Sequence, residues 1–376
     1  LIVRYTFFMI LTILSFVAIL SFLVFIHEFG HYIVARIIGV RVEEFGFGLP
    51  PRIWGKKVGE TVYSVNALPI GGFVRLAGED ALEEEESNVK KAYPKKELRS
   101  FFWARSKKER SAILLAGVTM NFFLAFVLTG VLVTRGIVEP TGRVHIETVV
   151  DGTPASVAGI QKLDTVLSIT VPTQTGVQTV IPKKPEDMIS TIKTHAGEQI
   201  IITIERSGKT IDFAVVPRVN PPKGQGALGV AVSDLERKTY PWYMVPIKSV
   251  EITFTRSWQM LSSIANVLWR LLTGVKVDSA EVSGPIGIAQ VTGQAIKYGW
   301  EAVFEFVSIL SLNLAILNIL PFPALDGGRL LFVFLEKLGK KTRPDIERII
   351  HQVGMMVLLA LTLLITINDI LRIVRG

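Results

Sequence analysis

A chain of 376 residues that is 49% hydrophobic and only 20% charged is too apolar for an ordinary soluble protein, and its composition is typical of membrane proteins. The formal net charge is +8, but no motif interleaves aromatic and basic residues, so membrane orientation explains the charge better than nucleic-acid binding does. The absence of cysteine excludes disulfides and thiolate metal sites.

Four stretches without a charged residue are candidates for membrane spans. A hydrocarbon core about 30 Å thick needs roughly 20 helical residues, so the first three stretches qualify and the last is just long enough. The stretches are 5–26, 111–134, 306–325 and 352–368. The alternatives are buried helices of a large soluble core and, for the first stretch, a removable signal peptide, although that stretch ends in HEFGH rather than in a cleavage site.

The motif HEFGH, residues 27–31, follows the first stretch. On a helix His27 and His31 lie one turn apart on the same face, and this spacing lets both imidazoles bind one Zn²⁺ at about 2.0–2.1 Å. Glu28 is offset around the helix, where it can hold a water beside the metal and act as general base. The alternative is two core histidines and a glutamate at a helix end. Ionisable groups inside an apolar helix are expensive, which favours the metal site.

The segment between the second and third stretches has a different composition. Residues 143–232 consist of short β-rich runs separated by turns, with one short helix over 185–197, and predict a compact, mostly-β domain of about 90 residues. Residues 240–300 carry apolar residues on a helical period that charged residues interrupt, and they include Trp242, Trp258 and Trp269. This pattern predicts an interfacial amphipathic helix rather than a fifth span.

A hydrolytic zinc site typically has three protein ligands, so one more is required. His145 and His195 lie in the β-rich segment, and His351 lies at the start of the fourth stretch. Asp326 is the better candidate, because two prolines in NILPFPALDGG interrupt the third stretch just before it. Backbone groups freed at membrane depth are tolerated only where protein or a water-filled cavity satisfies them. The alternative role for Asp326 is to cap the following helix.

HEFGH and NILPFPALDGG together resemble the paired HExxH and N-x-x-P-x-x-x-x-D-G motifs of the site-2 protease family of intramembrane zinc metalloproteases, of the bacterial regulator-of-sigma-E type. The resemblance implies that His27, His31 and Asp326 bind zinc. It also implies that Glu28 is the catalytic base and that Asn318 helps to hold the substrate backbone.

The resemblance covers two further segments. Residues 66–76, NALPIGGFVRL, would belong to a membrane-dipping β element, and TVYSVNALPIGGFVRL independently predicts two short strands around a Pro/Gly turn. An exposed edge there can pair with an unwound substrate by strand addition. Residues 149–169 are similar to part of a PDZ domain, except that Leu163 replaces a turn glycine, which predicts a rebuilt turn. The length allows a single PDZ domain.

The predicted fold class is an α-helical integral membrane protein with about four transmembrane helices, a membrane-associated β element and an inserted, mostly-β PDZ-like domain. Basic residues between 99 and 110 and between 329 and 348 place both loops in the cytoplasm by the positive-inside rule. The PDZ-like domain is then extracytoplasmic, and the resemblance implies a multi-pass protein of the bacterial inner membrane with its active site toward the cytoplasm. The predicted divisions are an N-terminal membrane core with the HExxH helix (1–139), the PDZ-like domain (140–235), an interfacial helical region (236–300) and a C-terminal membrane core with the Asp-Gly motif (301–376).

The resemblance implies a zinc-dependent endopeptidase that cuts single-span membrane proteins within or near the bilayer, in regulated intramembrane proteolysis of anti-sigma factors or in clearance of signal-peptide remnants. A substrate helix in lipid has all its peptide groups hydrogen-bonded, so it must open before water can reach a carbonyl. The alternatives are a non-catalytic membrane PDZ scaffold derived from such a protease and a metal transporter. Glu28 discriminates, because a degenerate scaffold would have lost it and a transporter does not explain its place beside His27.

Overall fold

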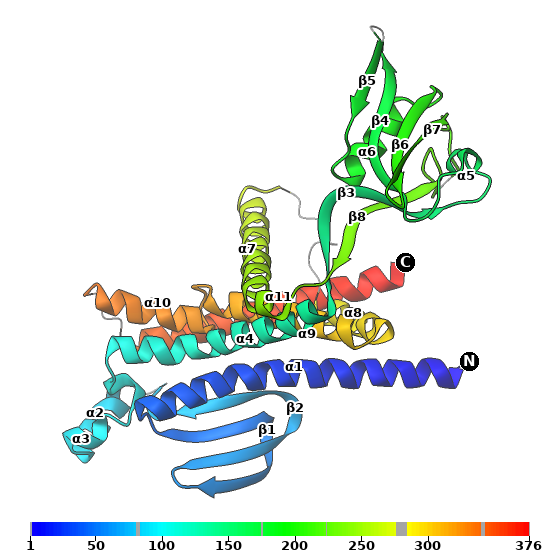
Figure 1. The fold of residues 1–376 in the computed structure, drawn as a ribbon. Coiled ribbons are helices and arrows are strands. Elements are labelled where there is room, and N and C mark those ends of the chain that lie inside the picture. Colours follow the sequence, from blue (N-terminus) through cyan, green and yellow to red (C-terminus); the bar gives the residue numbers. More distant parts are fainter. Residues whose placement is uncertain are drawn as a thin grey trace. The chain divides into compact units, whose positions relative to one another are not determined.

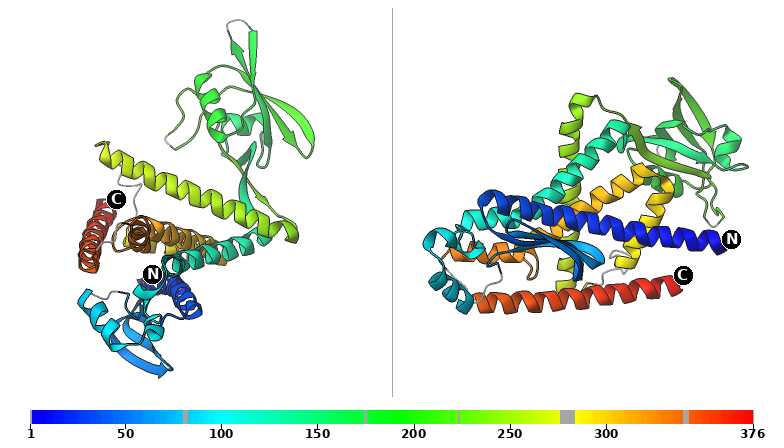
Figure 2. Two further views of the ribbon diagram at one scale, coloured as in Figure 1. Left: turned by 90° about the vertical axis from the view of Figure 1, so that its left-hand side faces the viewer. Right: turned by 90° about the horizontal axis from the view of Figure 1, so that it is seen from below.

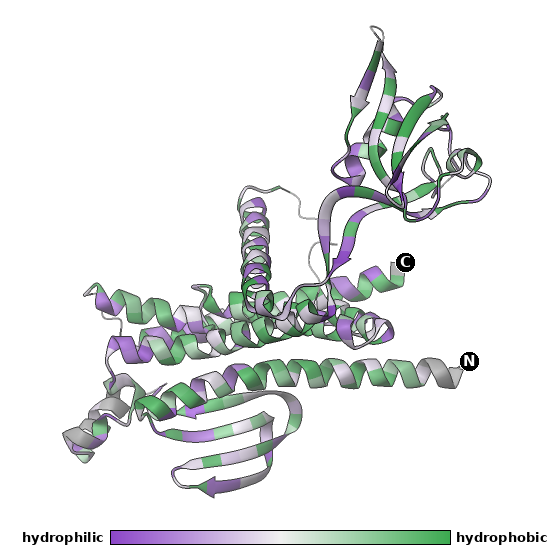
Figure 3. Ribbon diagram, in the orientation of Figure 1, coloured by the Kyte–Doolittle hydropathy of each residue, from purple (hydrophilic) through white to green (hydrophobic). Residues whose placement is uncertain are grey.

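The computed structural model describes residues 2–79, 83–173, 176–222, 224–275, 284–339 and 343–375. It divides into two compact units, of which one comprises residues 1–133 and 242–376 and the other residues 134–241. The first unit contains the long apolar helices, and the second contains a β sheet with two short helices (Figures 1 and 3).

Four helices of the first unit are long and apolar enough to cross a membrane, as the sequence predicts. These are α1 (Ile2–Ile38), α4 (Lys107–Arg135), α9 (Trp300–Ile319) and α11 (Pro344–Arg375). Helix α1 continues without a break through HEFGH, so the motif lies inside the helix rather than beyond its end. Helix α9 ends at Ile319 because Pro321 cannot donate the next helical hydrogen bond.

Glycine and serine residues let these helices pack closely together. A Cβ on Gly30 of α1 would lie 2.5 Å from the carbonyl oxygen of Ala116 in α4, so only glycine permits this approach. Ser311 of α9 donates to the carbonyl of Asn121 in α4 over 2.9 Å. Helix α4 is therefore held against both α1 and α9 by contacts that larger residues would disrupt.

The remaining helices of the first unit are shorter or amphipathic. They are α2 (Glu83–Ala92), α3 (Lys95–Leu98), the 3-10 helices η1 (Phe102–Ala104) and η2 (Trp242–Met244), α7 (Val245–Leu272), α8 (Pro285–Tyr298) and α10 (Asp326–Lys337). Helix α7 is not among the four candidate spans, and its large apolar side chains, including Phe254 and Trp258, are exposed. Helix α8 packs against α1, with Gly293 against Thr12. Part of the predicted interfacial region, 276–283, lies outside the described residues.

Two long strands, β1 (Val42–Val58) and β2 (Thr61–Leu76), bend to form four antiparallel runs beside α1 (Figures 1 and 2). The run 42–47 is central and pairs with 72–76 on one side and with 62–65 on the other. The run 72–76 is an edge of this sheet, and it faces α1. The sequence prediction of strands within 61–76 is confirmed, but it omitted β1, whose Gly/Pro-rich segment GFGLPP lacks a clear alternation.

The second unit has a six-stranded sheet in the order β7-β6-β4-β3-β8, with β5 paired to β4. Its elements are β3 (Ile137–Val149), α5 (Pro154–Ala158), β4 (Thr165–Thr173), β5 (Gly176–Val180), α6 (Pro185–Thr194), β6 (Ile200–Arg206), β7 (Lys209–Val215) and β8 (Val230–Lys238). The unit has its own apolar core, which includes Ile146, Ile169 and Ile202.

A buried ion pair and a strained residue lie at the start of β4. Asp164, which is 1% exposed, accepts hydrogen bonds from Arg206 and from the backbone N–H of Gln161. Leu163 beside it has φ +73°, the left-handed conformation that glycine adopts easily. The turn therefore keeps the left-handed backbone that glycine favours, although leucine stands there. The prediction that leucine would change the turn is wrong.

Candidate metal centre

Helix α1 brings the two histidines of HEFGH together. His27 and His31 are each 6% exposed, and their Nε2 atoms lie 3.2 Å apart. Both rings project from one face of the helix because the residues are four positions apart. The two imidazoles therefore lie close enough to bind one ion, which is the arrangement that their spacing in the sequence predicts.

Asp326 reaches the same point from the other end of the chain. It is the first residue of α10, which follows a tight turn after α9. Its Oδ2 atom lies 3.0 Å from His27 Nε2 and 3.2 Å from His31 Nε2. Of the candidates for a third ligand, the structure thus brings Asp326 to the histidines, at a sequence separation of 299 residues from His27.

The turn that places Asp326 is fixed by its neighbours. A Cβ on Gly327 or Gly328 would collide with backbone carbonyls of the turn, so both glycines let α10 fold back closely on it. His351 of α11 accepts a hydrogen bond of 2.9 Å from the backbone N–H of Ala324. His351 therefore supports the turn and is not part of the cluster.

The three ligand atoms fit a tetrahedral metal. Their separations are 3.0, 3.2 and 3.2 Å. Ligands at about 2.0–2.1 Å from a tetrahedral Zn²⁺ are separated by roughly 3.3 Å, and a fourth position remains open for water. Within the described part of the chain this is the one group of three such side chains that can hold an ion.

Helix α4 supplies partners for the other ring nitrogens. The Nδ1 of His31 lies 2.8 Å from the carbonyl oxygen of Ile113. A carbonyl only accepts, so this nitrogen carries a hydrogen, which leaves Nε2 as the nitrogen that can bind a metal. The Nδ1 of His27 lies 3.3 Å from the carboxamide of Asn121.

Gly117, one turn before Asn121 on α4, makes room for the two imidazoles. A Cβ at this position would lie 2.7 Å from Cε1 and 2.8 Å from Nε2 of His27, and closer still to His31 Nε2. The sequence analysis did not identify Gly117 or Asn121. Their spacing of four in GVTMN was the available signal, because it places both residues on one face of a helix. The role of the Ile113 carbonyl leaves no trace in the sequence.

Glu28 lies beside the cluster and is held by the sheet. Its Oε2 accepts a hydrogen bond of 3.0 Å from the backbone N–H of Val74, in the edge run of β2. The sheet is itself fixed to α1 by a 2.6 Å hydrogen bond between the hydroxyls of Tyr32 and Tyr63. The catalytic candidate therefore sits between the metal ligands and the edge run of β2.

The remaining sequence candidates lie elsewhere. Asn318 is in the last turn of α9, eight residues before Asp326, and it is partly exposed. His145 and His195 belong to the second unit, where His195 pairs with Glu198 at 2.8 Å. The structure thus places three of the predicted residues in one cluster and Glu28 next to it.

Comparisons with known proteins identify a family and several relatives. The chain matches the model of peptidase family M50 over residues 15–361. A protein of Fusobacterium nucleatum is 30% identical, over 96% of this chain and 98% of its own. The regulator of sigma-W protease RasP of Bacillus subtilis is 29% identical, over 96% and 98%, and the zinc metalloprotease RasP of Oceanobacillus iheyensis is 29% identical, over 96% and 99%.

Proposed function

The chain belongs to peptidase family M50 and is a zinc metalloprotease of bacterial membranes, and from this premise we propose that it cuts single-span membrane proteins within or near the bilayer. The single observation that carries the proposal is the meeting of His27, His31 and Asp326 among helices long enough to span a membrane. One relative is named a regulator of sigma-W protease, which suggests anti-sigma factors as one substrate class, and signal-peptide remnants are the other.

In this proposal His27, His31 and Asp326 hold the zinc ion through Nε2, Nε2 and Oδ2. Bound there, zinc supplies Lewis-acid activation of water and of the scissile carbonyl. Glu28 takes a proton from the attacking water and returns it to the leaving amine. The hydrogen bond from Val74 orients the Glu28 carboxylate for this work.

The edge of β2 offers a way to present the substrate. A transmembrane substrate must lose helical hydrogen bonds before its carbonyl can be attacked, and strand addition replaces those bonds. The run 72–76 is the sheet edge next to Glu28, which favours it as the docking strand. Asn318 lies in the last turn of α9, and we propose that it holds the substrate backbone on the side opposite the docking strand.

The orientation follows from the basic residues near α4 and α10. The positive-inside rule places those ends in the cytoplasm, the active site toward that side and the segment between α4 and α7 outside. We propose the divisions 1–139, 140–235, 236–300 and 301–376 as functional regions, with the second as a PDZ-like domain. The segment through α5 and β4, with its glycine-type backbone at Leu163, supports that assignment.

The test is Glu28→Gln in the full chain, reconstituted with a model single-span substrate. We expect one zinc per protein and no cleavage, because glutamine keeps the shape but cannot take the proton. Glu60→Gln, in the exposed turn between β1 and β2, is the matched control and should leave cleavage unchanged. Cleavage by Glu28→Gln at the wild-type rate would remove Glu28 from the mechanism. The same experiment tests the non-catalytic scaffold, which predicts no cleavage by the wild type either.

A further inference from the structure

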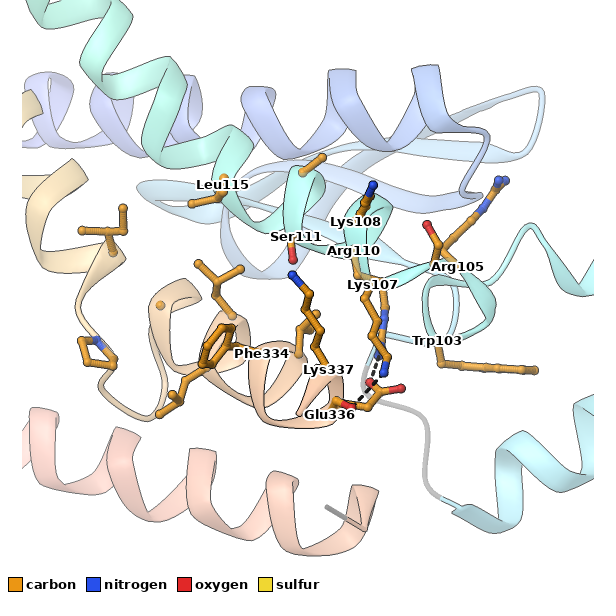
Figure 4. Close-up of a pocket in the computed structure, with 18 residues that line it drawn as sticks. Trp103, Arg105, Lys107, Lys108, Arg110, Ser111, Leu115, Phe334, Glu336 and Lys337 are labelled. Atoms are coloured by element: carbon orange, nitrogen blue, oxygen red, sulfur yellow. Dashed lines mark hydrogen bonds and ion pairs between the residues drawn. The ribbon is translucent and has the colours of Figure 1, made fainter. Parts of the chain in front are cut away.

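A cavity of about 1170 Å³ lies between α4 and α10 (Figure 4). One side of it is apolar and includes Leu115, Ile319 and Phe334. The other end is polar and includes Ser111, with Lys337 reaching toward it in Figure 4. Ligand sites for small molecules typically measure about 300–1,000 Å³, so this cavity has room for a larger amphiphile.

Positive charge exceeds negative charge at the polar end. Lys107 donates to the backbone carbonyl of Glu336 over 2.8 Å, and Arg110 pairs with the Glu336 carboxylate. Lys337 is one of three further cations that line the cavity, and Glu336 is the single acidic residue among the described lining residues. An occupant that complements these walls combines an anionic head with an apolar tail.

We propose that this cavity binds an anionic phospholipid. Its phosphate lies at Lys337 and Ser111, and an acyl chain follows Leu115 and Phe334. Basic pockets beside membrane helices bind anionic headgroups in this way, and each lysine near a lipid surface contributes to the attraction. A zwitterionic lipid offers the same chains and a phosphate, but the basic residues repel its headgroup cation, so the net attraction is weaker.

The site adjoins the candidate metal centre through the turn before α10. Ile319, Pro321 and Gly327 line the cavity, and Gly327 follows Asp326 directly. A bound lipid therefore packs against the segment that positions the third ligand. This proposal does not depend on the proteolytic activity, since retention of lipid can be measured without it.

The test uses the full chain taken from bilayers with equal phosphatidylglycerol and phosphatidylcholine, and retained lipid is counted by native mass spectrometry. We expect phosphatidylglycerol to be preferred and Lys337→Gln to reduce the preference about fivefold, the effect of one lysine near anionic lipid. Lys57→Gln, on an exposed run of β1, is the control and should keep the preference.

Two outcomes would overturn the lipid site. Equal retention of both lipids by the wild type would show that charge does not select the occupant. A preference that survives in Lys337→Gln would place the anionic lipid elsewhere. Leu115→Trp, which fills the apolar side, should reduce retention of either lipid, and unchanged retention would also contradict the proposal.

A different observation concerns the Asn121 carboxamide. Asn121 is fully buried, and its Oδ1 has no hydrogen-bond partner, while its Nδ2 lies 3.3 Å from His27 Nδ1. A histidine that binds a metal through Nε2 carries its hydrogen on Nδ1 and needs an acceptor there. Rotation of the carboxamide by 180° brings Oδ1 to that place.

We infer that Asn121 is a positioning residue that accepts from His27 Nδ1 and so fixes the tautomer that binds metal. The inference rests on the proposed function, because it takes the cluster to hold zinc. Ile113 does the same for His31 with its carbonyl, so α4 orients both imidazoles. Loss of such an outer partner typically weakens metal binding about 10–100-fold.

The variants Asn121→Leu and Asn121→Asp test whether the side chain at this position must accept a hydrogen bond from His27 Nδ1 or donate one to it. Leucine removes the acceptor, and zinc affinity, measured by chelator competition on the full chain, should fall about 10–100-fold. Aspartate only accepts, so it should keep the affinity within about threefold, as carboxylate–histidine–zinc arrangements do. If Asn121→Leu does not fold, Asn121→Ala takes its place, and melting of the zinc-free variants is the structural control.

The outcomes distinguish this inference from the proposed function. No zinc binding by the wild type would refute the metal centre itself. Wild-type affinity in Asn121→Leu, beside a zinc-binding wild type, would refute only the role of Asn121. An Asn121→Asp variant as weak as the leucine variant would show that donation from the amide, rather than acceptance, is what His27 requires.

Discussion

Gly117→Ala adds one methyl group where the two imidazoles meet α4. The new Cβ would lie 2.8 Å from His27 Nε2 and closer to His31 Nε2. Comfortable carbon contacts begin at about 3.5 Å, so His27 Nε2 would have to move by roughly 0.7 Å. Metal ligand distances tolerate only about 0.2 Å, so the three ligand atoms could no longer surround one ion.

The substitution should therefore act in opposite directions on zinc binding and on the zinc-free fold. Alanine is favoured over glycine in a helix by about 0.8–1.0 kcal/mol, and a free imidazole can rotate away from the methyl group. We expect the zinc-free melting temperature to stay the same or rise, while zinc affinity falls at least about 100-fold. This is the upper end of the loss seen when a hydrogen-bond partner of a metal ligand is removed.

The assay is zinc competition with a chelator on the full chain in detergent, beside thermal melting of the zinc-free protein. Gly130→Ala on the same helix is the control, because its Cβ would meet only Ser249 Oγ, at 3.3 Å, and Val245. Normal zinc affinity in Gly117→Ala would refute the packing of both histidines against α4. A fall in both affinity and zinc-free stability would indicate general damage instead.

Four further substitutions test the third ligand, the strained turn of the second unit and the packing of the sheet on α1. Asp326→Asn should weaken zinc binding at least about tenfold, because an amide oxygen replaces a charged ligand, and normal zinc content would remove Asp326 from the centre. Leu163→Gly should stabilise the second unit by roughly 0.5–1 kcal/mol, since φ +73° suits glycine, and hydrogen exchange of β3 and β4 in the full chain measures this; faster exchange would contradict the strain. Tyr63→Phe should destabilise the packing of the sheet on α1 by about 1 kcal/mol through loss of the hydrogen bond to Tyr32. Tyr32→Phe should cost as much, and additive losses in the double variant would show that the two hydroxyls do not interact.

Much of the metal centre could be predicted because its ligands are side chains at informative spacings. His27 and His31 share a helix face by periodicity alone, and Asp326 stands out as a carboxylate after prolines in an apolar stretch. The four candidate spans follow from uncharged length in the same way.

Other features could not be predicted because they depend on contacts between distant segments. The carbonyl of Ile113 belongs to a residue whose side chain says nothing about its backbone partner. Gly117 has meaning only once α1 lies against α4, and β1 gains its strand form from pairing on both sides rather than from its own Gly/Pro-rich sequence.

Anomalous diffraction at the zinc absorption edge, from crystals of the full chain, tests the central claim most directly. The account predicts one strong peak about 2.0–2.2 Å from His27 Nε2, His31 Nε2 and Asp326 Oδ2 together. A zinc peak elsewhere in the chain, or a zinc-loaded protein without a peak between these three atoms, would contradict it.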